Sequence, residues 1–302
     1  QPRSRGLGDV YKRQVYYQRS AELPGILDSR VQSFQPVMAK TARSGPTDGG
    51  RSSGDNRTNS LIHAGGFLLL MASINIHSQK ILILDFGSQY TQLIARRIRE
   101  AGVYCEIWDY DVSEDDFTAF APQGIVLSGS PESANTAVAP RPPAFIYEAG
   151  LPILGICYGM QTMAEEFGGR VEASDKSEFG FAQVNIVSGS VLLDDIEDRR
   201  LDSGTSQLDV WMSHGDKVTA VPPDFKIVAA TDSAPIAAMR HREKAFFGLQ
   251  FHPEVTHTLQ GIRIIEKFAL EICGCESLWT AASIIEDAIA TVQERVGKDQ
   301  VL

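Results

Sequence analysis

Long hydrophobic runs and cysteines are both scarce in this chain of 302 residues. The longest apolar run, residues 66–72, falls far short of the ~20 residues that a membrane-spanning helix needs, so the sequence predicts no membrane partner. Four cysteines in a chain of this length do not make a disulfide framework. Free thiols favour a reducing, cytoplasmic setting.

Positive charge is scarce beyond residue 70. Residues 1–70 carry 10 Lys and Arg against 5 Asp and Glu, a balance of +5, whereas residues 71–302 carry 18 against 33, a balance of −15. Nucleic-acid surfaces depend on clustered Lys and Arg, so the acidic main part predicts no nucleic-acid partner. The composition of the whole chain, 43% apolar and 22% charged, is that of a globular protein with one large domain or two ordinary ones.

Residues 1–70 show no persistent apolar periodicity and are rich in Arg, Ser and Gly. The chain begins with Gln1 instead of Met, and residues 1–14 resemble translated adapter sequence. We therefore expect residues 1–70 to be a disordered leader or a sequence artefact, with Met71 as the true start. An organelle-targeting peptide is the alternative, because the segment is basic and rich in Ser.

Short apolar runs alternate with helical patterns from Lys80 onward. The first run, residues 81–84, is continuously apolar and leads into a turn at Gly87 and Ser88. The same alternation continues, with expected strands at 104–108, 124–127 and 152–156 and expected helices at 90–101, 114–120, 143–149 and 161–167. Apolar strands that alternate with amphipathic helices indicate a parallel sheet covered on both faces, and such sheets carry their chemistry at the carboxyl ends of the strands.

The second half of the chain is richer in strand patterns. Expected strands lie at 182–187, 208–212, 226–230, 236–239 and 245–249, and expected helices at 258–272 and 281–296. The last helix carries one apolar stripe. The sequence therefore predicts an α/β fold with a mostly parallel central sheet flanked by helices.

Cys157 is the candidate nucleophile. It lies in Gly-Ile-Cys-Tyr-Gly-Met-Gln, residues 155–161, between an expected strand and an expected helix. This order is typical of a nucleophile elbow, with Cys where hydrolases carry Ser, and Gly155 and Gly159 leave room for the tight turn. A thiol at a helix N-terminus is favoured as thiolate. The alternative is a small buried hydrophobic residue, but the two flanking glycines at a strand end favour the nucleophile.

His252 and Glu254 are the candidate base and its orienting carboxylate. They lie two residues apart in Phe-His-Pro-Glu, residues 251–254, after an expected strand. In an extended segment both side chains share a side, so Glu254 can fix the tautomer of His252. The alternative is a surface hydrogen bond, but the pair ends a second strand of the same sheet, which favours catalysis.

These two motifs together resemble the class I, or triad, glutamine amidotransferases. More narrowly, residues 83–93, 211–218 and 252–258 resemble the GMP synthase family, and the resemblance runs from 79 to 302 without a break. It implies a flavodoxin-like three-layer fold over 71–274 that hydrolyses glutamine without a cofactor or a metal. It also implies that 275–302 is a linker helix toward an ATP pyrophosphatase domain, which uses ATP and Mg²⁺ to adenylate XMP and aminates it to GMP. That domain is expected to be missing here, as in a truncated gene model.

The resemblance also implies roles for further residues. The oxyanion hole is expected from the backbone N–H of Tyr158 and from Gly129 and Ser130, where the family usually has a second Gly in place of Ser130. The α-amino and α-carboxylate groups of glutamine are expected at Gln161, His214 and Asp216. Taken alone, the segment around His214 and Asp216 also fits an ordinary turn.

Other reactive side chains are expected to be structural. We expect Cys105 to lie in the core, Cys273 and Cys275 to bind no zinc, and His241 to sit in a solvated turn. The competing functions are an amidotransferase domain of another pathway, such as anthranilate or CTP synthesis, and a non-catalytic docking module. The motif at 86–90 argues against the first, and the intact Cys157, His252 and Glu254 argue against the second.

Overall fold

The computed structural model describes residues 75–136 and 138–297, and at 174–177 it describes the backbone alone. The expected leader at 1–70, with Met71, lies outside the described residues. The described part holds one sheet with the strand order β2-β1-β3-β4-β10-β9-β8-β5-β7-β6. No helix in this part is long and apolar enough to cross a membrane.

The first half of the sheet is parallel, as the sequence predicts. Strand β1 pairs with β2 and β3, β3 pairs with β4, and β4 pairs with β10, all in the same direction. The bounds of these strands lie within a residue or two of the expected ones: β1 Lys80–Asp85, β2 Tyr104–Asp109, β3 Gly124–Leu127, β4 Ile153–Ile156 and β10 Phe246–Leu249.

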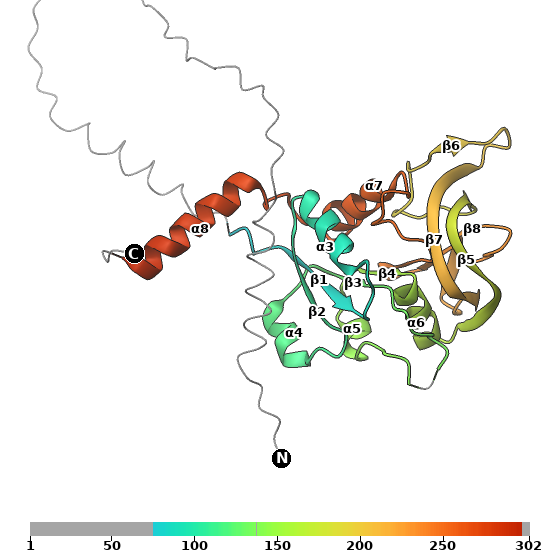
Figure 1. The fold of residues 1–302 in the computed structure, drawn as a ribbon, viewed down its shortest axis with the longest axis horizontal. Coiled ribbons are helices and arrows are strands. Elements are labelled where there is room, and N and C mark those ends of the chain that lie inside the picture. The colour runs from blue at the N-terminus through green and yellow to red at the C-terminus, as the bar shows by residue number, and fades with distance from the viewer. Residues whose placement is uncertain (1–74, 137, 298–302) are drawn as a thin grey trace, which may run out of the picture. The chain divides into compact units, whose positions relative to one another are not determined.

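Helices cover both faces of this parallel half, because the strands are apolar on both faces. In β1, Ile81 and Ile83 pack into a core with α3 (Thr91–Glu100) and α7 (Gly261–Glu266). Leu82 and Leu84 point the other way. They pack into a second core with α4 (Glu114–Phe120), α5 (Phe145–Glu148) and α6 (Tyr158–Glu166), and the two groups of helices lie on opposite sides of the sheet (Figure 1).

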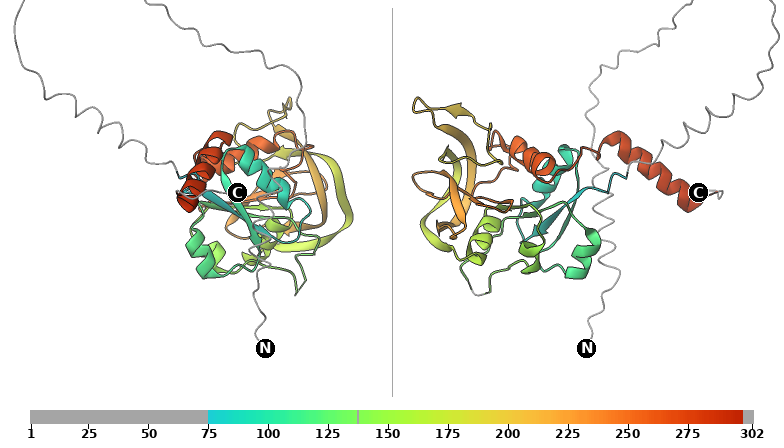
Figure 2. Two further views of the ribbon diagram at one scale, coloured as in Figure 1. Left: turned by 60° about the vertical axis from the view of Figure 1, so that its left-hand side comes forward. Right: turned by 180° about the vertical axis from the view of Figure 1, so that it is seen from behind.

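The second half of the sheet is antiparallel and its long strands exceed the expected ones. Strands β5 (Arg170–Ile186) and β7 (Ser206–Ala220) pair along most of their length and curve together at this end of the sheet (Figure 2). The sequence predicts only 182–187 and 208–212 as strands here, because the remainder is polar and carries turn-forming residues. The pairing of β5 with β7 overrides that local turn preference. The other members are β6 (Arg199–Arg200), β8 (Phe225–Ala230) and β9 (Ala238–His241).

The C-terminal helices follow the prediction with two changes. The expected helix at 258–272 begins at Gly261 and continues as a π-helix, η1 (Lys267–Ile272). The last helix, α8, spans Ala281–Val296, and Thr280 and Ser283 form a capping box at its start. No residue of α8 is buried, and its apolar stripe leaves Ile285 and Val292 more than half exposed.

Candidate active site

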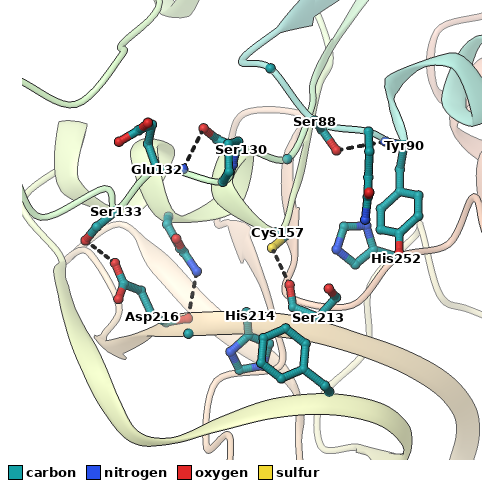
Figure 3. Close-up of a pocket in the computed structure, with 17 residues that line it drawn as sticks. Ser88, Tyr90, Ser130, Glu132, Ser133, Cys157, Ser213, His214, Asp216 and His252 are labelled. Atoms are coloured by element: carbon teal, nitrogen blue, oxygen red, sulfur yellow. Dashed lines mark hydrogen bonds between the residues drawn. The ribbon is translucent and has the colours of Figure 1, made fainter.

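The carboxyl ends of neighbouring parallel strands meet at one pocket of about 510 Å³. Its size is within the range of small-molecule sites. The pocket brings together segments from β1, β3, β4 and β10 with a wall from β5 and β7 (Figure 3). It is lined by Gly87, Ser88, Gln89, Tyr90, Gly129, Ser130, Pro131, Glu132, Ser133, Cys157, Gln161, Phe179, Ser213, His214, Gly215, Asp216 and His252.

Cys157 occupies the sharp turn between β4 and α6, as the glycine spacing predicts. Its backbone has φ 53° and ψ −106°, a strained conformation for a residue with a side chain. The flanking glycines allow the turn, because a Cβ on Gly155 would collide with the backbone of Gly159, and one on Gly159 with the backbone of Leu127. The strain and the close packing together hold the thiol at the pocket wall.

Cys157 is 5% exposed, and its sulfur makes two hydrogen bonds. Its Sγ donates to the backbone carbonyl of Ser213 at 3.6 Å and accepts from Nε2 of Gln250 at 3.7 Å. Gln250 is completely buried and was not among the expected site residues. The sequence offers one signal for it, namely an amide side chain directly after a buried strand and two residues before His252.

His252 and Glu254 form a buried pair beside the thiol. Nδ1 of His252 lies 2.7 Å from Oε1 of Glu254. His252 is 3% exposed and Glu254 is 1% exposed. The extended segment that the sequence predicts is not found, because β10 ends at Leu249 and a turn follows at Pro253 and Glu254. The turn still brings both side chains to one side.

Burial and charge act in opposite directions on His252. Burial lowers its pKa, whereas the carboxylate of Glu254 and the sulfur of Cys157 raise it, and the pKa ends well above its ordinary value. The ring therefore keeps its proton to a higher pH than an ordinary histidine does. Nε2 has no hydrogen-bond partner among the described residues and is the nitrogen left free for proton transfer.

Neighbouring residues that the sequence did not single out fix the position of His252. The ring of Tyr90 meets the His252 ring edge-on at a centroid distance of 5.1 Å (Figure 3). The hydroxyl of Thr258 donates to the backbone carbonyl of His252 at 2.6 Å. The backbone N–H of His252 donates to the backbone carbonyl of Trp211 on β7 at 3.0 Å. His252 is thus held in place through both its ring and its backbone.

The expected oxyanion-hole residues lie around the same pocket. Tyr158 is the first residue of α6, where backbone N–H groups have no partner within the helix. Gly129 and Ser130 follow β3 and line the pocket. Among the described residues, positive φ at non-glycine positions occurs at Ala121, Cys157 and Asp195, so Ser130 has the negative φ that a side chain favours.

The three expected glutamine-binding residues also reach this pocket. His214 and Asp216 lie within β7, so their interpretation as an ordinary turn is wrong. Nε2 of Gln161 donates to the backbone carbonyl of Asp216 at 2.8 Å and to Oε1 of Gln250 at 3.3 Å. The carboxylate of Asp216 accepts from the hydroxyl of Ser133 (Figure 3).

His214 is a buried imidazole whose two ring nitrogens have no hydrogen-bond partner among the described residues. Burial lowers its pKa, and the carboxylate of Glu178, 3.7 Å from Nε2, opposes that effect without reversing it. A neutral imidazole offers one donor and one acceptor. The sequence could not indicate Glu178, because its contact with His214 depends on the cross-strand register between β5 and β7.

The other reactive side chains lie outside the pocket. Cys105 is completely buried in β2, as expected. His241 is 7% exposed, and its Nδ1 accepts from the backbone N–H groups of Glu243 and Lys244, so the prediction of a solvated turn is wrong. The aromatic rings around it belong to Phe167, Phe225 and Phe246, of which only Phe246 is close to it in sequence. In the described part of the chain, no group of three or more His, Cys, Asp or Glu is arranged to hold a metal ion.

Comparisons with known proteins agree on one family. Residues 82–272 match the model of glutamine amidotransferase class-I. A protein of Photobacterium profundum named GMP synthase (glutamine-hydrolyzing) is 60% identical over 233 residues, which are 77% of this chain and 44% of that protein. A protein of Escherichia coli with the same name is 59% identical over 228 residues, 76% of this chain and 43% of that protein.

The chain thus spans less than half the length of the curated relatives it matches. Among solved structures, a protein of Thermoplasma acidophilum aligns with a TM-score of 0.55 at 28% identity, over 70% of this chain and 98% of that one. The family model alone covers more than half of the 302 residues. The chain belongs to the class-I glutamine amidotransferase family.

Proposed function

We propose that this chain hydrolyses glutamine to glutamate and ammonia, with Cys157 as nucleophile, His252 as acid and base, and Glu254 as the carboxylate that orients His252. One observation carries the proposal: a strained, buried thiol and a buried imidazole–carboxylate pair meet at the same pocket. Nucleophile, base and orienting group in this arrangement are the parts that acyl transfer requires.

The reaction begins when His252 takes the thiol proton and the sulfur of Cys157 attacks the side-chain amide carbon of glutamine. A carbon–sulfur bond forms, and the carbonyl electrons move onto the oxygen. The backbone N–H of Tyr158 and the loop of Gly129 and Ser130 stabilise that oxyanion, and each donor in such a hole contributes about 10²–10³ in rate. The intermediate collapses, the carbon–nitrogen bond breaks, and His252 gives its proton to the departing ammonia.

Water completes the turnover. His252, now neutral, takes a proton from a water molecule, which attacks the thioester carbon. The second tetrahedral intermediate releases the sulfur of Cys157, the proton returns to it, and glutamate leaves. The raised pKa of His252 suits the first half of the cycle, because the imidazolium must persist until ammonia departs.

Glutamine is held by its α-amino and α-carboxylate groups at the opposite side of the pocket. Both N–H groups of the Gln161 amide are used within the protein, which leaves its carbonyl oxygen as an acceptor for the α-ammonium. The carboxylate of Asp216 is a second partner for that positive charge. The neutral ring of His214 can donate one hydrogen bond to the α-carboxylate.

In this proposal the ammonia serves a synthetase domain. The name of the 60% identical relatives supports the GMP synthase assignment. In this proposal an ATP pyrophosphatase domain uses ATP and Mg²⁺ to adenylate XMP and then aminates it to GMP, and α8 leads toward that domain from the amidotransferase domain at 71–274. A reducing, cytoplasmic setting suits the four free cysteines.

The test is ammonia release from glutamine by the 302-residue chain and by its Cys157→Ala variant. We expect release by the unchanged chain and a loss of at least about 10³-fold in the variant, as for other removed nucleophiles. A thermal melt of both proteins shows whether the fold is retained. Equal rates in the two proteins contradict the proposal and favour the non-catalytic docking module.

A further inference from the structure

Gln250 is a fully buried amide that the proposed reaction leaves without a role. It directly follows β10, between Leu249 and Phe251, both of which are buried apolar side chains. A buried amide is costly unless its polar atoms are paired. The two partners of Gln250 belong to the pocket: Oε1 accepts from Gln161, and Nε2 donates to the sulfur of Cys157.

The orientation of the Gln250 amide follows from its neighbours. Gln161 donates one N–H to the backbone carbonyl of Asp216 at 2.8 Å and the other to Gln250 at 3.3 Å. The acceptor toward Gln161 must therefore be the carbonyl oxygen of Gln250. Its NH₂ group then points to the sulfur, because the two ends of an amide lie on opposite sides of the same carbon.

Of the two hydrogen-bond partners of the Cys157 sulfur, one suits the thiol and the other suits the thiolate. The backbone carbonyl of Ser213, at 3.6 Å, accepts a proton from the thiol and has nothing to offer a thiolate. The amide N–H of Gln250, at 3.7 Å, makes a stronger hydrogen bond when the sulfur is charged. Losing this donor removes an interaction that favours the attacking form.

We propose that Gln250 is a positioning residue that stabilises the thiolate formed when His252 takes the proton of Cys157, and that connects this sulfur to Gln161. The inference rests on the proposed function only in taking Cys157 as the nucleophile. Gln161 lines the pocket where the α-ammonium of glutamine is proposed to bind. A ligand at Gln161 therefore contacts a two-residue chain of amides that ends at the reacting sulfur.

The test is the pH dependence of the alkylation of Cys157 by iodoacetamide, read by mass spectrometry of the peptide that contains it. Gln250→Met keeps the side-chain length and removes the donor, and Gln250→Glu replaces the donor with a carboxylate. Gln293→Glu on α8 is the matched control, because it makes the same chemical change at an exposed position. The other titratable groups around the sulfur stay unchanged: Glu132, Glu178, His214, Asp216, His252 and Glu254.

We expect the pH of half-maximal alkylation to be higher in Gln250→Met than in the unchanged chain, and higher still in Gln250→Glu. Gln250→Met should raise it by about one pH unit, which is a roughly tenfold loss of rate near neutral pH. Gln250→Glu should raise it further, because a carboxylate repels the thiolate. Gln293→Glu should leave it unchanged. Packing damage alone does not produce this order, and equal half-maximal pH values in all four proteins overturn the inference.

A second variant keeps the inference testable if both changes at Gln250 prevent folding. Gln161→Met removes the hydrogen bond that orients Gln250 and lies on the pocket side of the chain. It is expected to raise the half-maximal pH above that of the unchanged chain, and an unchanged value overturns the inference. Alkylation needs no glutamine, so ammonia release that persists in Cys157→Ala would sink the proposed function without deciding the role of Gln250.

Discussion

At the scale of single residues, the charge of Glu254 determines the protonation of His252. Burial lowers the pKa of this imidazole, and the carboxylate outweighs that effect together with Cys157. In Glu254→Gln the shape is kept and the charge is lost, so burial dominates and the pKa falls. The imidazolium needed to protonate ammonia then disappears at a lower pH.

The measurable result is the pH dependence of kcat/KM for glutamine hydrolysis. We expect the alkaline limit of Glu254→Gln to move to lower pH by at least about one unit, with a rate near neutral pH reduced about tenfold or more. Glu286→Gln on α8 makes the same change at an exposed position and serves as the control. An alkaline limit that stays in place would show that Glu254 does not raise the pKa of His252.

Residues with local signals were predictable, and residues defined by long-range contacts were not. Cys157 was found because two glycines and a strand end mark its turn within five residues of sequence. The contacts of Gln250 and Glu178 could not be predicted in this way, since their partners lie 93 and 36 residues away. The error at His241 has a similar origin: its charged neighbours in sequence suggest solvent, whereas the rings of Phe167 and Phe225, 74 and 16 residues away, help to bury it.

At the scale of elements, the close approach of α6 to β3 depends on Gly159. A Cβ at this position would collide with the backbone of Leu127, which cannot move aside as a flexible side chain can. We expect Gly159→Ala to lower the free energy of unfolding by about 1–3 kcal/mol, the usual cost of overpacking, and to reduce glutamine hydrolysis by displacing Cys157.

Urea unfolding measures this cost, and Gly189→Ala is the control. Gly189 is exposed, and the nearest atom to an added Cβ is 3.8 Å away. Equal unfolding midpoints for the two variants would mean that the approach of α6 to β3 is not tight.

The parallel half of the sheet was predictable as a set of elements because both of its faces are buried. Its strands are short and wholly apolar, as in β3 and β4, and its helices have one apolar face. Strand β7 could not be predicted in full, because it carries Ser213, Gly215 and Asp216, which have turn preferences. Only the register with β5 makes that segment a strand.

At the scale of the whole molecule, the C-terminal segment is anchored by Trp279, just before α8. Trp279 packs against Tyr104 at a ring-centroid distance of 4.8 Å, and its backbone N–H donates to the backbone carbonyl of Gly102 at 2.7 Å. The helix that follows has no buried residue. We therefore expect removal of residues 281–302 to leave the melting temperature within about 2 °C, since little buried surface is lost.

Trp279→Ala in the full chain is the comparison. It should lower the melting temperature by about 3–8 °C, because a half-buried aromatic contact of about 1–2 kcal/mol is removed. Differential scanning fluorimetry of both proteins decides between these outcomes. A larger loss on removing 281–302 than in Trp279→Ala would show that α8 is part of the stable unit.

The two halves of the sheet contribute different parts of the pocket. The thiol belongs to the parallel half, at the junction of β4 and α6, whereas His214 and Asp216 belong to β7 in the antiparallel half. In the proposed reaction the bond-breaking groups therefore lie in the parallel half, whereas glutamine binding is shared between Gln161 on α6 and the two residues of β7. Redesign toward a different amide donor should begin with the side chains of β5 and β7, where amino-acid exchanges leave the turn at Cys157 intact.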